Sequence, residues 1–157
     1  MSPNKYVVGM TISKLIENLE WHRDPNNCSV TAVAIACDLS YDDAYKLLKT
    51  EGRKHGKGAK SWSIRKACEN HVDLHYTKFK SYKGRQFRTF FNNEIEFLNG
   101  RIVLVLIKDH IVAINNCVIQ DFETRYDSRS IIRQVWVVHP KGQKPEEERR
   151  VFSFKIK

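Results

Sequence analysis

The chain has 157 residues and a net charge of +9, because 27 lysines and arginines outnumber 18 acidic residues. With 41% hydrophobic and 11% aromatic residues, it does not have the composition of an intrinsically disordered protein. This length predicts a single domain over 1–157 that can bury a core. The positive charge favours an acidic partner, which is a nucleic acid, an acidic protein or an anionic surface, although a basic surface that serves only solubility explains it equally well.

The four cysteines lie at positions 28, 37, 68 and 117 and form no CxxC motif or other paired metal spacing. Cys28 and Cys37 fall on one predicted helix, too far apart for a disulfide. We therefore expect reduced thiols and a cytoplasmic protein with no cofactor and no metal. The start of the chain lacks a signal-peptide pattern, and no apolar run approaches the ~18 residues of a membrane span, so no membrane contact is expected.

The first half of the sequence predicts mainly helices. Apolar residues at 15–19 indicate a helical turn, and the turn residues at 24–27 end it and cap the next helix. That helix begins at Cys28 and is apolar on most sides, as expected for a buried central helix. Ser40 is the expected N-cap of a further helix, which Gly52 ends.

The middle of the chain predicts a mixture of elements. Either Ser61 or Ser63 is expected to cap a helix that continues through Cys68. Alternating apolar and polar residues predict a strand over 72–80, and apolar residues at helical spacing predict a helix over 85–98. A zinc pair at positions 71 and 75 would need both histidines on a helix, which the alternation argues against.

The second half predicts strands. They are expected at 101–108, in a hairpin over 111–121, at 131–138 and at 151–156. The continuous apolar run in the first of them is typical of a strand buried on both faces. This order predicts an α+β fold, in which a helical part over about 10–100 packs on an antiparallel sheet over about 101–157.

Three residues of these elements form a candidate thiol site. Cys28 opens a helix, where the positive end of the helix dipole stabilises a thiolate. If Asn115 and Asn116 form a two-residue turn, His110 lies directly opposite Asp121, with Cβ atoms ~4.5–5.5 Å apart. A carboxylate there would orient the imidazole as a general base. We therefore predict Cys28 as the nucleophile, His110 as the base and Asp121 as the orienting acid.

Attack by a thiolate also needs donors for the oxyanion that it creates. The backbone N–H of Cys28 is one candidate, and the side-chain amide of Asn26 or Asn27 is the second. Ordinary explanations exist for each member of the triad, since a buried free cysteine is usually inert and charged residues at strand ends are common. The prediction therefore depends on the combination of the three residues.

The motifs around these residues resemble a known family. One segment begins at Asn26 and reads Asn-Asn-Cys-Ser-Val-Thr-Ala-Val-Ala-Ile-Ala-Cys. The other begins at Asp109 and reads Asp-His-Ile-Val-Ala-Ile-Asn-Asn-Cys-Val-Ile-Gln-Asp-Phe. The first, together with the Ser-Tyr-Asp-Asp-Ala-Tyr-Lys-Leu-Leu-Lys-Thr-Glu-Gly-Arg segment that begins at Ser40, looks like small papain-like cysteine peptidases carried by tailed bacteriophages. The second is similar to a segment common in papain-like folds of this kind, including leader-peptide peptidases. The resemblance covers roughly residues 24–58 and 100–122.

This resemblance implies a papain-like fold and a peptidase or amidase reaction on a protein or peptide substrate. It assigns the three triad roles to Cys28, His110 and Asp121. For a phage protein, it also implies action in the cytoplasm of the bacterial host. The sequence departs from the family at the position that usually holds an oxyanion glutamine, because His22 stands there.

A second hypothesis makes charge, rather than the thiol, the basis of function. Basic residues concentrate in the middle third of the chain, partly in a glycine-bearing loop at 53–60. The residues expected to bind nucleic acid or an acidic host protein are Lys54, Lys57, Lys60, Arg65, Lys66, Lys83, Arg85 and Arg88. In this alternative the papain-like fold is a catalytically weak or inactive scaffold. The same side chains could equally form a solvated surface.

Overall fold

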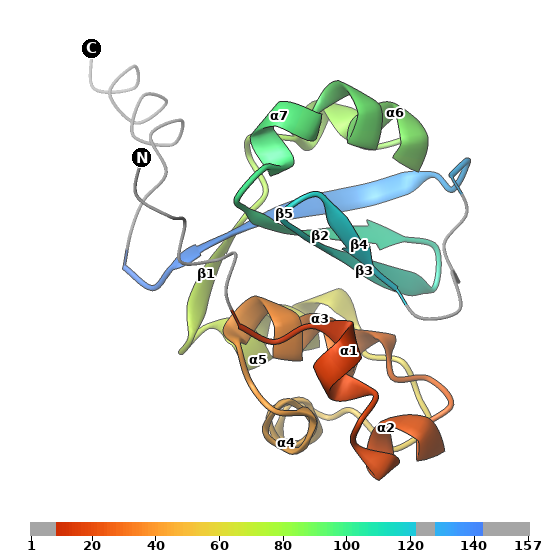
Figure 1. Ribbon diagram of the computed structural model, residues 1–157, viewed down its shortest axis with the longest axis vertical. Coiled ribbons are helices and arrows are strands. Elements are labelled where there is room, and N and C mark those ends of the chain that lie inside the picture. The colour runs from red at the N-terminus through yellow and green to blue at the C-terminus, as the bar shows by residue number, and fades with distance from the viewer. Residues whose placement is uncertain (1–8, 122–127, 143–157) are drawn as a thin grey trace.

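The structure is a computed structural model that describes residues 9–121 and 128–142. Within these ranges, five antiparallel strands form a sheet in the order β1-β5-β2-β3-β4 (Figure 1). The strands span β1 Val72–His75, β2 Ile102–Ile107, β3 His110–Asn115, β4 Val118–Gln120 and β5 Ile132–Pro140. Together with the helices, this sheet makes an α+β fold.

Helices cover both faces of the sheet (Figure 1). One face carries α1 Ile12–Leu15, α2 Leu19–Arg23, α3 Cys28–Cys37, α4 Tyr41–Thr50 and α5 Ser61–Cys68. The other carries the short 3-10 helix η1 Lys80–Tyr82, α6 Phe87–Asn93 and α7 Ile95–Leu98. The prediction of helices followed by an antiparallel sheet is confirmed in outline. Strand β1 departs from it, because it lies within the part assigned to helices and pairs with β5.

Each face of the sheet packs against its own hydrophobic core. Ile102 and Leu104 of β2 lie in the core beneath α3, whereas Val103 and Val105 lie in the core beneath α6 and α7. Successive side chains of a strand point to opposite faces, so a strand covered on both sides must be apolar at every position. This explains the uninterrupted apolar run of β2 and confirms that it is buried on both faces.

Two predicted elements are shorter than expected. The helix predicted over 85–98 is broken at Glu94, whose φ of −109° and ψ of 18° are not helical. Asn92 and Asn93 precede this break, and asparagine competes poorly as a helix former because its side chain bonds to nearby backbone. The strand predicted over 72–80 ends at His75, where its pairing with β5 stops.

The helix caps agree with prediction in one case and differ in another. Ser40 caps α4, since its Oγ accepts a hydrogen bond of 3.2 Å from Asp43 N. Neither predicted serine caps α5, whose N-cap is Lys60. Ser63 instead donates from Oγ to the carbonyl of Glu51, which ties α5 to the end of α4. The strand predicted at 151–156 lies outside the described residues.

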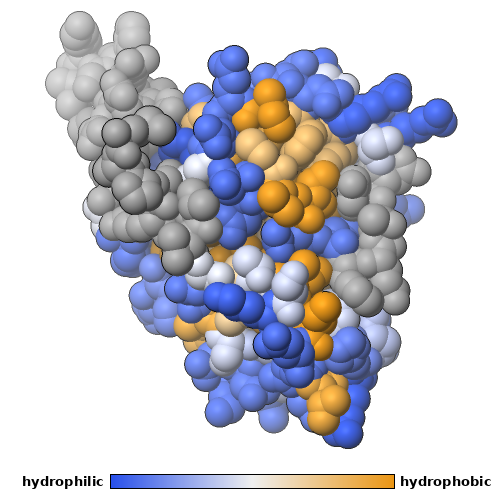
Figure 2. Space-filling model, in the orientation of Figure 1, coloured by the Kyte–Doolittle hydropathy of each residue, from blue (hydrophilic) through white to orange (hydrophobic). Residues whose placement is uncertain are grey.

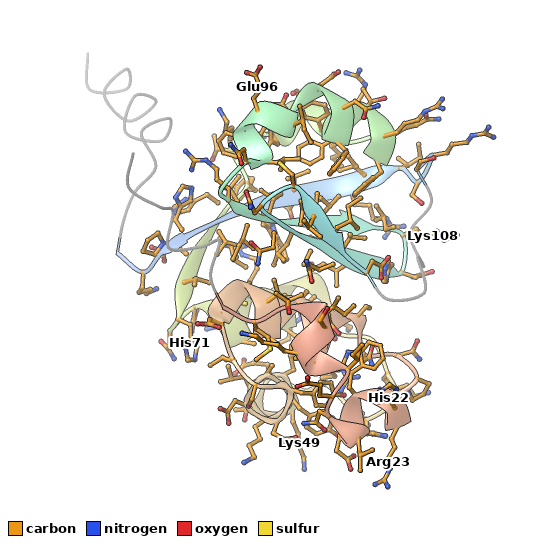
Figure 3. The ribbon with its side chains drawn as sticks, in the orientation of Figure 1. His22, Arg23, Lys49, His71, Glu96 and Lys108 are labelled. Carbon is orange, nitrogen blue, oxygen red and sulfur yellow. The ribbon has the colours of Figure 1, made fainter. Side chains whose placement is uncertain are left out.

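The surface is mostly hydrophilic on the face shown, with hydrophobic residues gathered over α7 and the β3–β4 hairpin (Figure 2). Ile95 and Val118 are 41% and 55% exposed there. Charged side chains such as Lys49 on α4 and Glu96 on α7 point outward from opposite ends of the molecule (Figure 3). None of the described helices is both long and apolar enough to cross a membrane.

Candidate active site

Cys28 is the first residue of α3, the central helix of the molecule. This helix is apolar on most sides, and its residues 29–36 are buried between β3 and the helices α4 and α5. The first hydrogen bond of the helix runs from Thr31 N to the carbonyl of Asn27, at 2.9 Å. The N–H groups before Thr31 therefore have no partner within the helix, and the thiol lies at the positive end of the helix dipole.

A buried ion pair fixes the loop that leads into Cys28. Arg53 Nη2 lies 2.7 Å from Asp24 Oδ2, and the two side chains are 1% and 0% exposed. Asp24 Oδ1 accepts from the backbone N–H groups of Asn26 and Gly56, and Arg53 also donates to the carbonyl of Asn26. Burial by itself would raise the pKa of Asp24, but Arg53 and these hydrogen bonds hold it below its usual value. The pair anchors the chain just before the thiol.

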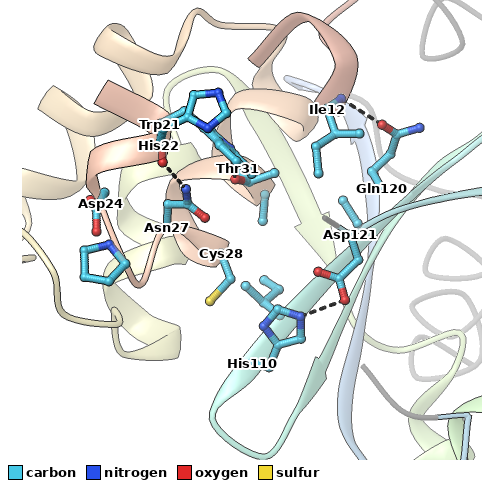
Figure 4. A pocket seen from close by; sticks show the side chains of 14 residues that line it. Ile12, Trp21, His22, Asp24, Asn27, Cys28, Thr31, His110, Gln120 and Asp121 are labelled. Carbon is cyan, nitrogen blue, oxygen red and sulfur yellow. Dashed lines mark hydrogen bonds and ion pairs between the residues drawn. The ribbon is translucent and has the colours of Figure 1, made fainter. Parts of the chain in front are cut away.

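His110 and Asp121 come together at one end of the hairpin. His110 Nε2 lies 3.0 Å from Asp121 Oδ2, and their side chains are only 6% and 7% exposed. A carboxylate can only accept, so Nε2 carries the proton of this hydrogen bond. The other ring nitrogen, Nδ1, is buried and makes no hydrogen bond of standard geometry with the described residues. It faces the sulfur of Cys28 (Figure 4).

The hairpin reaches this contact through a different register from the predicted one. Asn115 pairs with Val118, so the turn consists of Asn116 and Cys117, with φ values of 51° and 66°. The prediction that the turn is Asn115-Asn116, with His110 directly opposite Asp121, is wrong. Because the register moves by two residues, the two side chains stay on the same side of the hairpin as diagonal neighbours. Positive φ at both turn positions is typical of the tight hairpin turn that matches strand twist.

The surroundings of His110 favour its charged form. Burial of the ring lowers its pKa, but the interactions with Asp121 and with the Cys28 sulfur outweigh burial and raise the pKa to about 9. At neutral pH the ring is therefore an imidazolium beside the thiol. A neighbouring imidazolium stabilises a thiolate, which is the nucleophilic form of cysteine.

Two hollows meet at the Cys28–His110 pair. The smaller, of about 190 Å³, lies between α1–α3 and the hairpin, and Trp21, Asn27 and Gln120 help to line it (Figure 4). The larger, of about 880 Å³, runs between the start of α5 and the ends of β2 and β5. Cys28 and His110 line both hollows. An extended chain could thus pass across the thiol with one part in each hollow.

The oxyanion candidates have different surroundings. The side-chain amide of Asn26 donates to the carbonyl of Gly56, at 2.7 Å, and holds the loop. Asn27 donates to the carbonyl of Trp21, at 2.6 Å, and lines the smaller hollow with Cys28. Asn27 is the N-cap residue of α3, as the turn cluster predicts, but its side chain makes no capping hydrogen bond. His22 bonds through its ring to the main-chain oxygen of Ile16.

The eight predicted basic residues differ in their local contacts and in the hollows that they line. Lys60 and Lys83 line the larger hollow, whereas Arg65 and Lys66 line a separate hollow beside β1 with Trp62. Two of the others are held locally, since Arg85 lies over the ring of Tyr82 and Arg88 donates to Gln86. Lys54 and Lys57 are exposed in the loop between α4 and α5. The middle third of the chain therefore supplies charge to several places.

The site also uses residues that no motif indicates. The contact between Asp24 and Arg53 joins positions 29 apart in the sequence, and no local spacing predicts it. Gln120 accepts a hydrogen bond of 2.8 Å from Ile12 N and ties α1 to the hairpin beside Asp121. A polar residue in a strand of otherwise apolar neighbours was the available signal for Gln120. Within the described ranges, no group of three or more metal-ligating side chains is arranged around an ion site.

Comparison of the chain with protein-family models, with curated proteins and with solved structures finds no match.

Proposed function

We propose that this protein is a papain-like cysteine hydrolase that cleaves a peptide or amide bond, with Cys28, His110 and Asp121 as its catalytic triad. The observation that carries the proposal is the position of His110. One ring nitrogen bonds to the buried Asp121 carboxylate, and the other faces a thiol at the start of a helix. This is the chain of contacts that orients an imidazole and activates a nucleophile.

In the first half of the proposed reaction, the Cys28 thiolate attacks the carbonyl carbon and forms a C–S bond. The negative charge moves to the carbonyl oxygen, where the N–H groups at the start of α3 stabilise it. His110 then gives its Nδ1 proton to the leaving nitrogen as the C–N bond breaks. An amine departs, and the acyl group remains on Cys28 as a thioester.

In the second half, the neutral His110 takes a proton from water, which attacks the thioester carbonyl. The C–S bond breaks, the carboxylic acid leaves, and the thiolate–imidazolium pair is restored. Asp121 keeps its hydrogen bond to Nε2 throughout, so that the ring changes charge without turning. The same residues would transfer the acyl group to an amine if an amine replaced water.

The proposal includes a papain-like fold and, from the motif resemblance, a phage accessory protein that acts in the host cell. The α+β layout supports it, with the thiol on a buried helix and the other two residues on an antiparallel hairpin. Of the eight basic residues, Lys60 and Lys83 line the hollow beside the thiol, whereas Arg65 and Lys66 line a separate one, so they do not share a single groove for a nucleic-acid strand.

A peptide library digest tests this function. The protein is incubated with a mixture of synthetic peptides, and mass spectrometry counts new peptide termini. We expect termini that appear with the native chain and are absent with Cys28→Ala and with His110→Ala, while Lys49→Ala on the distant helix α4 behaves as the native chain. Termini that persist in Cys28→Ala would come from a contaminant. A digest with no Cys28-dependent termini would contradict a general peptidase.

A further inference from the structure

The larger hollow beside the thiol is positively charged. Three cations line it: Lys60, Lys83 and Arg133. Among the described residues, Asp109 is the acidic residue that also lines it. All three cations are exposed, and within the described ranges none of them forms an ion pair. Three cations that meet at one cleft from separate elements, and that have no ion-pair partner in the described part of the chain, attract an anionic ligand.

The backbone holds two of these cations on one wall. Gly84 N donates to the carbonyl of Ile132, and Ile132 N donates to the carbonyl of Arg85, both at 2.8 Å. These bonds attach the segment after η1 to the start of β5, so that Lys83 and Arg133 stand on neighbouring stretches of backbone.

An irregularity of the sheet also affects the direction of the Arg133 side chain. Leu106 pairs with Gln134 and Ile107 pairs with Ile132, so Arg133 is the extra residue of a β-bulge. A bulge redirects the side chain that it contains, and bulges are frequent beside active sites. Without the bulge, side chains would alternate strictly between the two faces of the sheet along β5, and the side chain of Arg133 would follow that alternation.

The start of α5 carries the third cation. Lys60 is the N-cap residue of α5, and Ser61 at the start of that helix lines the same hollow. The first N–H groups of a helix carry partial positive charge, which adds to that of the lysine. The apolar side chains of Ile64, Leu106 and Ile107 also line the cleft and can accept the aliphatic part of a substrate chain.

We infer that the substrate is a peptide chain with acidic side chains on the part that occupies this cleft. The inference rests on the proposed function and adds to it a class of substrate. The cleft volume of about 880 Å³ lies in the range of ligand sites, about 300–1,000 Å³. Among the described residues, no phenylalanine, tyrosine or tryptophan lines the cleft, whereas grooves for single-stranded nucleic acid use aromatic rings to stack bases.

Matched peptidyl epoxides test the inference, because they alkylate an activated cysteine without the need for a known substrate. Each carries the same short peptide with Glu-Glu, Gln-Gln or Lys-Lys, attached in turn on either side of the epoxide. Mass spectrometry follows the rate of labelling at Cys28. We expect the Glu-Glu probe to react about three- to tenfold faster than the Gln-Gln probe in one orientation, and the Lys-Lys probe to react slowest. Higher salt should reduce the difference.

Variants locate the origin of the preference. The ratio of Glu-Glu to Gln-Gln rates should fall towards one in Lys60→Ala/Lys83→Ala/Arg133→Ala and stay at the native value in Lys49→Ala. Equal rates for all probes in both orientations, with rapid and His110-dependent alkylation by iodoacetamide, would overturn the inference and leave the hydrolase proposal intact. Slow alkylation by iodoacetamide would overturn both. An oligonucleotide that binds the native chain but not the triple variant, with no preference among the probes, would make the cleft a nucleic-acid groove.

Discussion

His110 Nε2 lies 3.0 Å from Asp121 Oδ2, and this hydrogen bond leaves Nδ1 as the ring nitrogen that faces Cys28. The arrangement ties the charge of the ring to the stability of the fold. In the folded chain the pKa of His110 is about 9, against an ordinary value of about 6.5. The folded state therefore binds the proton more tightly than the unfolded chain, and protonation of His110 stabilises the fold.

The pH dependence of folding should show this directly. The contribution of His110 is complete below pH ~6.5 and is lost as the pH rises through about 9, with an upper limit of about 3 kcal/mol. Urea unfolding of the native chain and of His110→Gln at pH 6, 7.5 and 9.5 measures it. We expect the difference in unfolding free energy to shrink steadily across this series. A difference that is constant from pH 6 to 9.5 would contradict the raised pKa.

Replacement of Asp121 should separate the orienting role from the fold. In Asp121→Asn the amide can still contact Nε2, but the negative charge is gone, so the pKa of His110 should fall. We expect turnover of a cleaved peptide to drop roughly 10²- to 10⁴-fold, because the ring loses both its fixed tautomer and the charge that stabilises the imidazolium. The pH profile of the remaining activity should shift to lower pH. Turnover within twofold of the native rate would exclude Asp121 from the triad.

The ion pair between Asp24 and Arg53 should be a major source of stability. Arg53→Ala leaves a fully buried carboxylate without its partner, which typically costs about 3–5 kcal/mol. Replacement of both residues, as Asp24→Leu/Arg53→Met, should recover much of that loss, because it removes the uncompensated charge. Urea unfolding measures both, with Lys49→Ala expected within about 0.5 kcal/mol of the native chain. A cost below about 1 kcal/mol in Arg53→Ala would mean that solvent reaches the pair.

The two asparagines before Cys28 should give opposite results. Asn27 lines the smaller hollow beside the thiol and uses one amide N–H for the Trp21 carbonyl, so Asn27→Ala should lower turnover by about 10²–10³-fold if the second N–H serves as an oxyanion donor. Asn26 lines the larger hollow and holds the loop through Gly56, so Asn26→Ala should lower the unfolding free energy by about 1 kcal/mol. Steady-state kinetics and urea unfolding of each variant distinguish the roles. Normal turnover in Asn27→Ala would leave the oxyanion to backbone N–H groups alone.

Local patterns predicted the elements that carry the site. The apolar run after Cys28 and the run of β2 identify buried elements, because burial on all sides removes the need for polar residues. The alternation of side chains in a hairpin predicts that His110 and Asp121 lie close together. Although the predicted turn is wrong, they do lie close, because a two-residue change of register keeps both side chains on one side of the hairpin.

Such local patterns do not predict contacts between residues that are far apart in the sequence. The pairing of β1 with β5 joins segments more than sixty residues apart, and nothing in either strand specifies its partner. The same holds for the ion pair of Asp24 with Arg53, because the sequence indicates only that Arg53 belongs to a basic, glycine-bearing loop. The bulge that aims Arg133 into the cleft depends on the register of two strands, so no property of Arg133 itself could indicate it.

The reactivity of Cys28 towards iodoacetamide tests the central claim most directly, because it needs no substrate. The labelling rate is measured from pH 5 to 10 by peptide mapping, with Cys117 as an internal reference, in the native chain and in His110→Ala. The account predicts rapid labelling of Cys28 below pH ~7 that is lost in His110→Ala. Labelling of Cys28 that follows an ordinary thiol titration near pH ~8.5, unchanged by His110→Ala, would contradict it.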